Sequence, residues 1–151
     1  STNAIGALTY DAANGVLYAG TGEPNASGDS EAGMGIYKST DSGKKWTKLD
    51  SKVTALTTDS CAASNATGGC VALSPNGTYT GDAFVGRSIS SSVIDPTNPN
   101  TLYVSSTRGV RGVSSVTGGA TSNPPPSRPP YGLFKSTDGG ATFSVLHASD
   151  R

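Results

Sequence analysis

The amino-acid sequence predicts an all-β chain built from two copies of one unit, each with four short strands. Glycine accounts for 20 of the 151 residues, nearly twice its usual share of about 7%, and only 15% of the residues are charged. This composition is typical of short strands joined by many turns. No stretch shows sustained helical periodicity. The third observation is an internal repeat, which divides the chain into the two units.

The repeat is clearest where two segments align without a gap, residues 36–49 and residues 133–146. Upstream, residues 8–19 align with residues 92–104. The second copy differs in length chiefly in one long connection, residues 105–131, and connections are where insertions are best tolerated. We therefore expect the same strand order in both copies.

The expected strands are rich in Val, Ile, Leu, Tyr and Thr and are separated by Gly, Asn, Asp and Pro. Asn14-Gly15 predicts a tight hairpin, because both residues tolerate positive φ. Residues 95–100 predict a second hairpin through turns set by proline. The strands are expected near residues 5–10, 16–21, 35–39 and 46–49 in the first copy, and near 89–94, 101–106, 132–136 and 142–146 in the second.

A Ser-x-Asp-x-Gly-x-x-aromatic motif lies between the third and fourth strand of each copy. Here an aspartate can accept backbone N–H groups across the turn, a serine hydroxyl can join it, and glycine permits a left-handed residue. The aromatic ring is expected to pack between sheets. The motif residues are Ser39, Asp41, Gly43 and Trp46 in the first copy, and Ser136, Asp138, Gly140 and Phe143 in the second.

These motifs resemble the Asp-box, or BNR, repeat of sialidases, sortilin-type receptors, xyloglucanase-like glycosidases and secreted bacterial β-propellers. Residues 17–25 and 95–103 resemble the BNR/sortilin-like group, and the resemblance covers about residues 1–50 and 85–147. It implies a partial β-propeller of two four-stranded antiparallel blades, belonging to a larger ring, because propellers have about 4–8 blades. It also implies that the Asp boxes are structural and far apart, rather than a catalytic carboxylate pair.

Three parts are expected along the chain: a blade at residues 1–50, an inter-blade insertion at residues 51–84, and a second blade at residues 85–151. Met34 is the only methionine, so we expect Ser1 to follow removed or further sequence. Repeat units cannot bury their faces alone, so remaining blades or partner subunits are expected to cover them. The side chains expected on these faces are Ile5, Leu17, Ile36, Trp46, Ile89, Leu102, Phe134 and Phe143.

The two cysteines, Cys61 and Cys70, lie in a Ser- and Gly-rich stretch with no neighbouring metal ligands. A disulfide closing this loop is the favoured interpretation, and two free thiols are the alternative. A disulfide would place the protein in an oxidising compartment, extracellular, periplasmic or at the cell surface.

An acidic loop carries Glu23, Asp29 and Glu31 between the second and third strands of the first copy. Such a loop can bind Ca²⁺ or supply glycosidase carboxylates, but the spacing of an EF-hand is absent. A solvated loop is the simpler interpretation. No cofactor is therefore expected, with calcium as the one candidate.

The matching loop of the second copy carries Arg108, Arg111 and Arg128 and a proline-rich stretch at residues 123–131. Three arginines can bind a carboxylate or sulfate, and Pro126-x-x-Pro129 can dock on an aromatic groove. A rigid contact loop is the alternative.

Two function classes follow. The first is a secreted binding or assembly module that contacts a glycan, a protein or another copy through its blade loops. The alternative is part of a BNR-type glycoside hydrolase, sialidase- or xyloglucanase-like, whose catalytic carboxylates lie mostly outside these residues. The first is favoured because no acid and nucleophile can be named, although fold does not decide whether the protein is an enzyme. Zero net charge and the lack of a long apolar run argue against a nucleic-acid partner and a membrane span.

Overall fold

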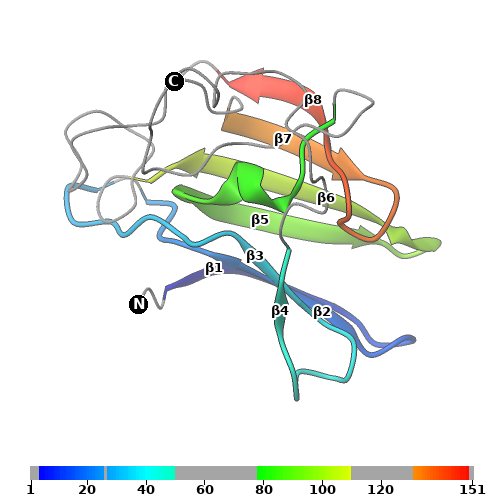
Figure 1. The fold of residues 1–151 in the computed structure, drawn as a ribbon. Helices are drawn as coiled ribbons and strands as arrows, with labels where there is room; N and C mark the ends of the chain where they lie inside the picture. The colour runs from blue at the N-terminus through cyan, green and yellow to red at the C-terminus, as the bar shows by residue number, and fades with distance from the viewer. Residues whose placement is uncertain (1–3, 26, 50–77, 110–130, 150–151) are drawn as a thin grey trace.

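The computed structural model describes residues 4–25, 27–49, 78–109 and 131–149, which form two four-stranded antiparallel sheets (Figure 1). The N-terminal sheet contains, in order, β1 (Ile5–Asp11), β2 (Val16–Thr21), β3 (Ile36–Ser39) and β4 (Thr47–Lys48). The C-terminal sheet contains β5 (Arg87–Asp95), β6 (Asn98–Arg108), β7 (Tyr131–Ser136) and β8 (Ser144–Ser149). A single turn of 3-10 helix, η1 (Gly81–Phe84), precedes β5. The prediction of an all-β chain with two four-stranded sheets is confirmed.

The hairpins that open each sheet show why the strands begin and end where they do. The β1–β2 hairpin lies where Asn14-Gly15 predicts it, but its turn spans four residues, 12–15, and only Gly15 in it has a positive φ, of 65°. In the β5–β6 hairpin the turn is shorter than predicted, because β6 already begins at Asn98. Asp95 Oδ1 accepts hydrogen bonds from the Thr97 backbone N–H at 2.8 Å and from its hydroxyl at 2.7 Å. These bonds close a turn with only Pro96 and Thr97 between the paired residues Asp95 and Asn98, whereas six residues, 95–100, were expected between the strands.

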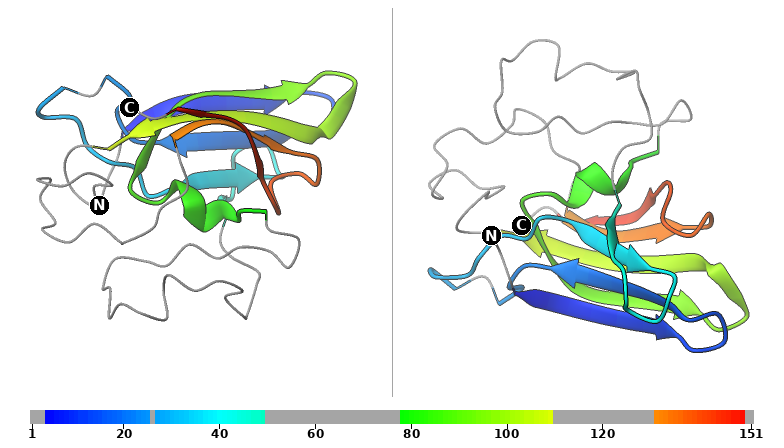
Figure 2. Two further views of the ribbon diagram at one scale, coloured as in Figure 1. Left: turned by 90° about the horizontal axis from the view of Figure 1, so that it is seen from above. Right: turned by 60° about the horizontal axis from the view of Figure 1, so that its bottom comes forward.

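The two sheets pack face to face through non-equivalent surfaces. Strand β5 lies against β1 and β2, as Figures 1 and 2 show. The N-terminal sheet contributes the face that carries Tyr18 and Ile36, whereas the C-terminal sheet contributes the face that carries Leu102 and Phe134. In the repeat, Tyr18 corresponds to Tyr103, which lies on the opposite face of the C-terminal sheet. The packing is therefore head to tail, and each sheet keeps one open face.

The core lies between the sheets and also takes in the segment before β5. Phe84 of η1 is fully buried, and its ring meets Phe134 and Phe143 edge to face with centroids 5.1 and 4.9 Å apart. Tyr79 exchanges two backbone hydrogen bonds with Phe143, each at 2.7 Å. The predicted insertion at residues 51–84 therefore ends inside the core. Residues 78–84, at the end of this insertion, therefore pack together with the second repeated unit, which was expected to begin at residue 85.

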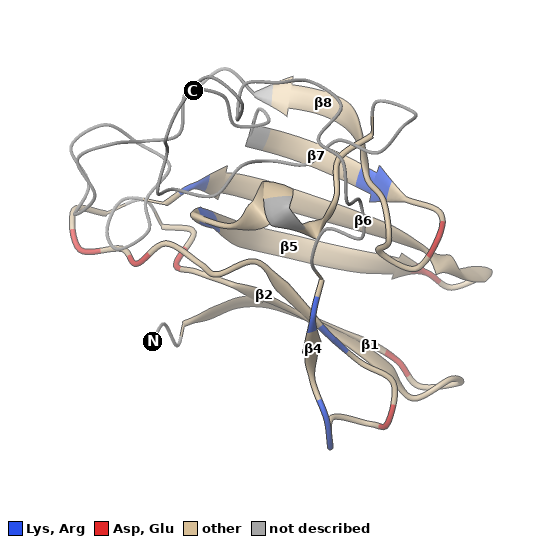
Figure 3. Cartoon of the chain, in the orientation of Figure 1, with Lys and Arg blue, Asp and Glu red and all other residues tan. Residues whose placement is uncertain are grey.

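Charged residues gather in the turns and at strand ends, while most of the strand surface is uncharged (Figure 3). Within the described ranges, no helix is long and apolar enough to cross a membrane. The two open sheet faces carry few charges, and exposed surfaces of this kind often mark interaction sites.

Candidate functional site

The first motif turn joins β3 to β4, and one carboxylate holds it together. Asp41 Oδ1 accepts hydrogen bonds from the Lys45 backbone N–H and from the Ser39 hydroxyl, each at 2.8 Å. Ser39 Oγ in turn accepts the Gly43 N–H at 2.9 Å. The bond from the Lys45 backbone, followed by that from Ser39, lowers the pKa of Asp41 below its ordinary value. This carboxylate acts as an acceptor within the turn.

The second motif turn joins β7 to β8 and repeats the same arrangement. Asp138 Oδ1 accepts from the Ser136 hydroxyl at 2.7 Å and from the Thr142 N–H at 2.9 Å, and Oδ2 accepts from the Thr142 hydroxyl at 2.6 Å. Gly140 donates its N–H to Ser136 Oγ at 2.8 Å. Partial burial alone would raise the pKa of Asp138, but the hydrogen bonds from Thr142 and Ser136 outweigh it and lower that pKa.

The aromatic residues of the two motifs have different surroundings. Phe143 is fully buried against Phe84, whereas the Trp46 ring remains 39% exposed. Trp46 Nε1 donates to the Gly43 carbonyl of its own turn at 3.0 Å. Within the chain, therefore, only Phe143 packs between the two sheets, and the Trp46 ring lies beside the open face of the N-terminal sheet.

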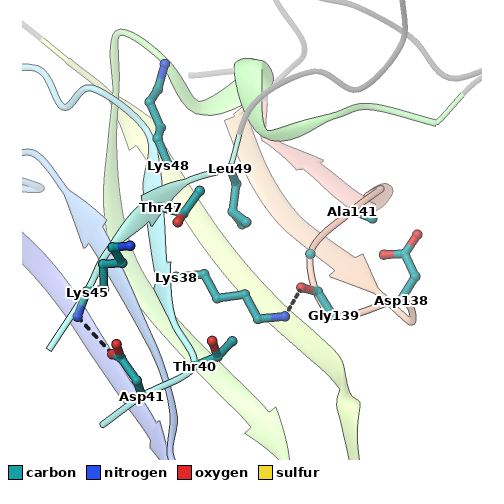
Figure 4. A pocket seen from close by; sticks show the side chains of 11 residues that line it. Lys38, Thr40, Asp41, Lys45, Thr47, Lys48, Leu49, Asp138, Gly139 and Ala141 are labelled. Atoms are coloured by element: carbon teal, nitrogen blue, oxygen red, sulfur yellow. Dashed lines mark hydrogen bonds between the residues drawn. The ribbon is translucent and has the colours of Figure 1, made fainter. Parts of the chain in front are cut away.

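A pocket of about 290 Å³ lies between the two motif turns and is lined by residues of both (Figure 4). Asp41 and Asp138 both border it. Lys38 and Gly139 lie between the two carboxylates in the view of Figure 4. Both carboxylates are occupied within their own turns, so the pocket offers no acid and base that face one substrate position.

Two side chains of the N-terminal sheet instead clamp the second motif turn. The Tyr18 hydroxyl and Lys38 Nζ both donate to the Gly139 carbonyl oxygen, at 3.0 and 2.9 Å. Lys38 Nζ also lies 5.2 Å from the centroid of the Tyr18 ring, where a cation–π contact supports the pair. We call these two residues the first Tyr–Lys pair. Their role is to join the two sheets through a backbone carbonyl of the turn.

The open face of the N-terminal sheet forms an apolar groove of about 510 Å³. Ile5 and Leu8 of β1 are 56% and 63% exposed, and Tyr37 and Trp46 line the other side of the groove. Met34 completes it. A contiguous apolar patch on a protein surface usually marks an interaction site.

The acidic loop folds back on itself through its own carboxylates. Glu23 Oε2 accepts the Glu31 backbone N–H at 3.0 Å, and Asp29 accepts a hydrogen bond from the Ser27 hydroxyl. Among the residues that the structure describes, no group of three or more His, Cys, Asp or Glu is placed to hold a metal ion. The hydrogen bonds assign these carboxylates to the conformation of the loop.

The remaining candidate residues are only partly covered by the structure. Arg108 is exposed at the end of β6, where it pairs with Arg87 of β5 in the sheet register. Arg111, Arg128, Cys61 and Cys70 lie outside the described residues, so the arginine cluster and the disulfide stay predictions.

The Tyr–Lys pair is a functional feature that the sequence analysis did not single out. A signal for it was present, because Tyr18 and Lys38 recur as Tyr103 and Lys135 at equivalent positions of the repeat. Alternation along a strand shows that such residues share a face, but it does not show which face another sheet covers.

The chain matches no protein-family model and no curated protein.

Proposed function

We propose that this chain is an Asp-box β-propeller segment that works as an assembly module, through sheet-to-sheet stacking in an extracytoplasmic protein. The observation that carries the proposal is the equivalence between its open apolar face and a buried one. Residues on the open face of the N-terminal sheet correspond, through the repeat, to residues on the packed face of the C-terminal sheet. An equivalent surface is thus already used for packing within the same chain.

The equivalence holds residue by residue. Ile5, 56% exposed, corresponds to the fully buried Ile89, and both residues directly precede a β-bulge. Tyr37 corresponds to the buried Phe134. Burying a large apolar side chain contributes roughly 1.5–3 kcal/mol, so covering several of them favours association. The assembly surface is therefore the sheet face, and the loops named from the sequence are secondary to it.

The glycoside hydrolase alternative is less well supported by the described carboxylates. A general acid in such an enzyme needs a raised pKa. The three described aspartates with a shifted pKa, Asp41, Asp95 and Asp138, are all shifted downward by hydrogen bonds in turns. This direction suits turn-stabilising acceptors and does not suit a proton donor.

Light scattering over a range of protein concentrations tests the proposal. We expect the wild-type chain to associate above its monomer mass of 15.1 kDa. Leu8→Asp, which places a charge in the open groove, should return the protein to monomers that still melt cooperatively, because Leu8 is already 63% exposed.

Ala13→Asp is the matched control, since it adds the same charge in the exposed β1–β2 turn, which does not line the apolar groove. It should leave association unchanged. A wild-type chain that stays monomeric at all concentrations and melts cooperatively would overturn the proposal.

A further inference from the structure

The open face of the C-terminal sheet carries a second Tyr–Lys pair. Tyr103 of β6 and Lys135 of β7 are directly paired in the sheet register, as are Tyr18 and Lys38. Lys135 Nζ lies 5.5 Å from the centroid of the Tyr103 ring, close to the 5.2 Å of the first pair. The two side chains are therefore already arranged as a clamp on a face that no described segment covers.

The carbonyl that the first pair binds also has an equivalent. Gly139 corresponds to Ser42 in the β3–β4 turn, and their φ angles are 68° and 60°. Each donates its N–H to the hairpin that opens its sheet: Gly139 to the Asn100 carbonyl at 2.8 Å and Ser42 to the Gly15 carbonyl at 3.0 Å. Ser42 is exposed, and we infer from its equivalence with Gly139 that its carbonyl is the matching acceptor on the open side of the N-terminal sheet.

We propose that Tyr103 and Lys135 clamp the Ser42 carbonyl oxygen of another copy of this chain, so that copies stack head to tail. This inference rests on the proposed assembly function and names its partner. Each copy carries both halves of the contact, the clamp on the C-terminal sheet and the turn on the N-terminal sheet. An interface between two different surfaces of identical chains adds copy after copy, and it gives a ring where the rotation closes and an open filament where it does not.

A second contact supports this partner independently. Within the chain, the Thr9 hydroxyl lies 2.6 Å from the Ser92 carbonyl and 2.5 Å from its hydroxyl oxygen, a polar contact between the sheets. The equivalents of these residues are Val93 and Leu8, which are 54% and 63% exposed. Both members of the polar pair are thus replaced by apolar residues. An apolar pair at these positions fits a contact in which Val93 of one copy packs against Leu8 of the next.

At the position equivalent to Gly20, the two sheets must lie farther apart between copies than they do within the chain. A Cβ atom at Gly20 would lie 2.4 Å from Ile89 Cγ2, so glycine permits that close approach. The residue equivalent to Gly20 is Ser105, which would meet Ile5 of the next copy. The added side chain separates the sheets at this end. We therefore assign most of the specificity to the clamp and to the Val93–Leu8 contact.

A mixing experiment tests the head-to-tail arrangement. Leu8→Asp and Val93→Asp each break one half of the contact and should each be monomeric by light scattering. Because each variant keeps the other half intact, an equimolar mixture should form a species of twice the monomer mass and grow no further. Unchanged melting temperatures of the two variants would show that both remain folded.

The clamp is tested with a double variant, Tyr103→Phe with Lys135→Met. Loss of both donors should raise the dissociation constant for self-association by about tenfold or more. Tyr10→Phe with Lys48→Met removes the same two groups from the open face of the N-terminal sheet, and it should not raise the dissociation constant. Its positions correspond to Ile94 and Val145, which offer no polar group to the packed face.

Two outcomes separate this inference from the proposed function. If the wild-type chain does not associate, both are overturned. If association is lost in Leu8→Asp but persists in Val93→Asp and in the clamp variant, assembly through the open groove stands. The head-to-tail contact is then replaced by a symmetric pairing of two N-terminal sheets.

Discussion

The approach of β2 to β5 can be probed by adding one methyl group at Gly20. A Cβ atom there would lie 2.4, 2.5 and 3.0 Å from Cγ2, Cβ and Cγ1 of Ile89, all shorter than an ordinary van der Waals contact. Ile89 is fully buried, so its side chain has no free space to enter. Overpacking of this kind costs typically about 1–3 kcal/mol. Gly20→Ala should therefore separate the two sheets or strain them.

An opposing effect reduces the net loss of stability. Replacing glycine by alanine where φ is ordinary stabilises a protein by about 0.4–1 kcal/mol, because the unfolded chain has fewer conformations. We expect Gly20→Ala to lower the free energy of unfolding by about 1–2 kcal/mol. In a domain of this size, each kcal/mol lowers the melting temperature by about 2–4 °C. Differential scanning calorimetry at one fixed protein concentration measures the shift.

Gly28→Ala is the matched control for this experiment. A Cβ atom at Gly28 has no other heavy atom within 4 Å, and its φ lies outside the left-handed region. This variant should be neutral or slightly more stable than the wild type. Equal melting temperatures for Gly20→Ala and Gly28→Ala would refute the close packing of β2 on β5.

Four further predictions concern the turns and the cysteines. Asp138→Ala should lower the free energy of unfolding by about 1–2 kcal/mol, because it leaves turn donors without their acceptor, and urea unfolding measures it. Asp41→Ala should destabilise in the same direction, and an unchanged melting temperature with lost association would contradict a structural role. Since the pKa of Asp138 is lowered in the folded state, its stabilising contribution is present above the unfolded pKa of about 3.9 and is lost as the pH falls through the folded value. Asp138→Asn should remove that part of the acid sensitivity. Thiol titration of the denatured, unreduced protein should find no free sulfhydryl at Cys61 or Cys70, and two reactive thiols would remove the case for an oxidising compartment.

Local features could be predicted from the sequence because their causes are local. The repeat located the strands, and the Asn14-Gly15 pair located a hairpin, since a short turn depends on the conformations of its own residues. The same is true of the motif turns, where Ser39, Asp41 and Gly43 are close in sequence and contact one another directly.

The tertiary structure decided which of two apolar faces is covered. In stacked sheets both faces carry apolar side chains. Alternation along a strand therefore shows which residues share a face, but it does not show which of the two faces is covered. Trp46 and Phe143 occupy the same motif position, yet one ring is exposed and the other is buried, because only Phe143 has Phe84 beside it. Phe84 lies in a segment that matches neither copy of the repeat. Its entry into the core depends on contacts with residues 50 or more positions away, which no local pattern records.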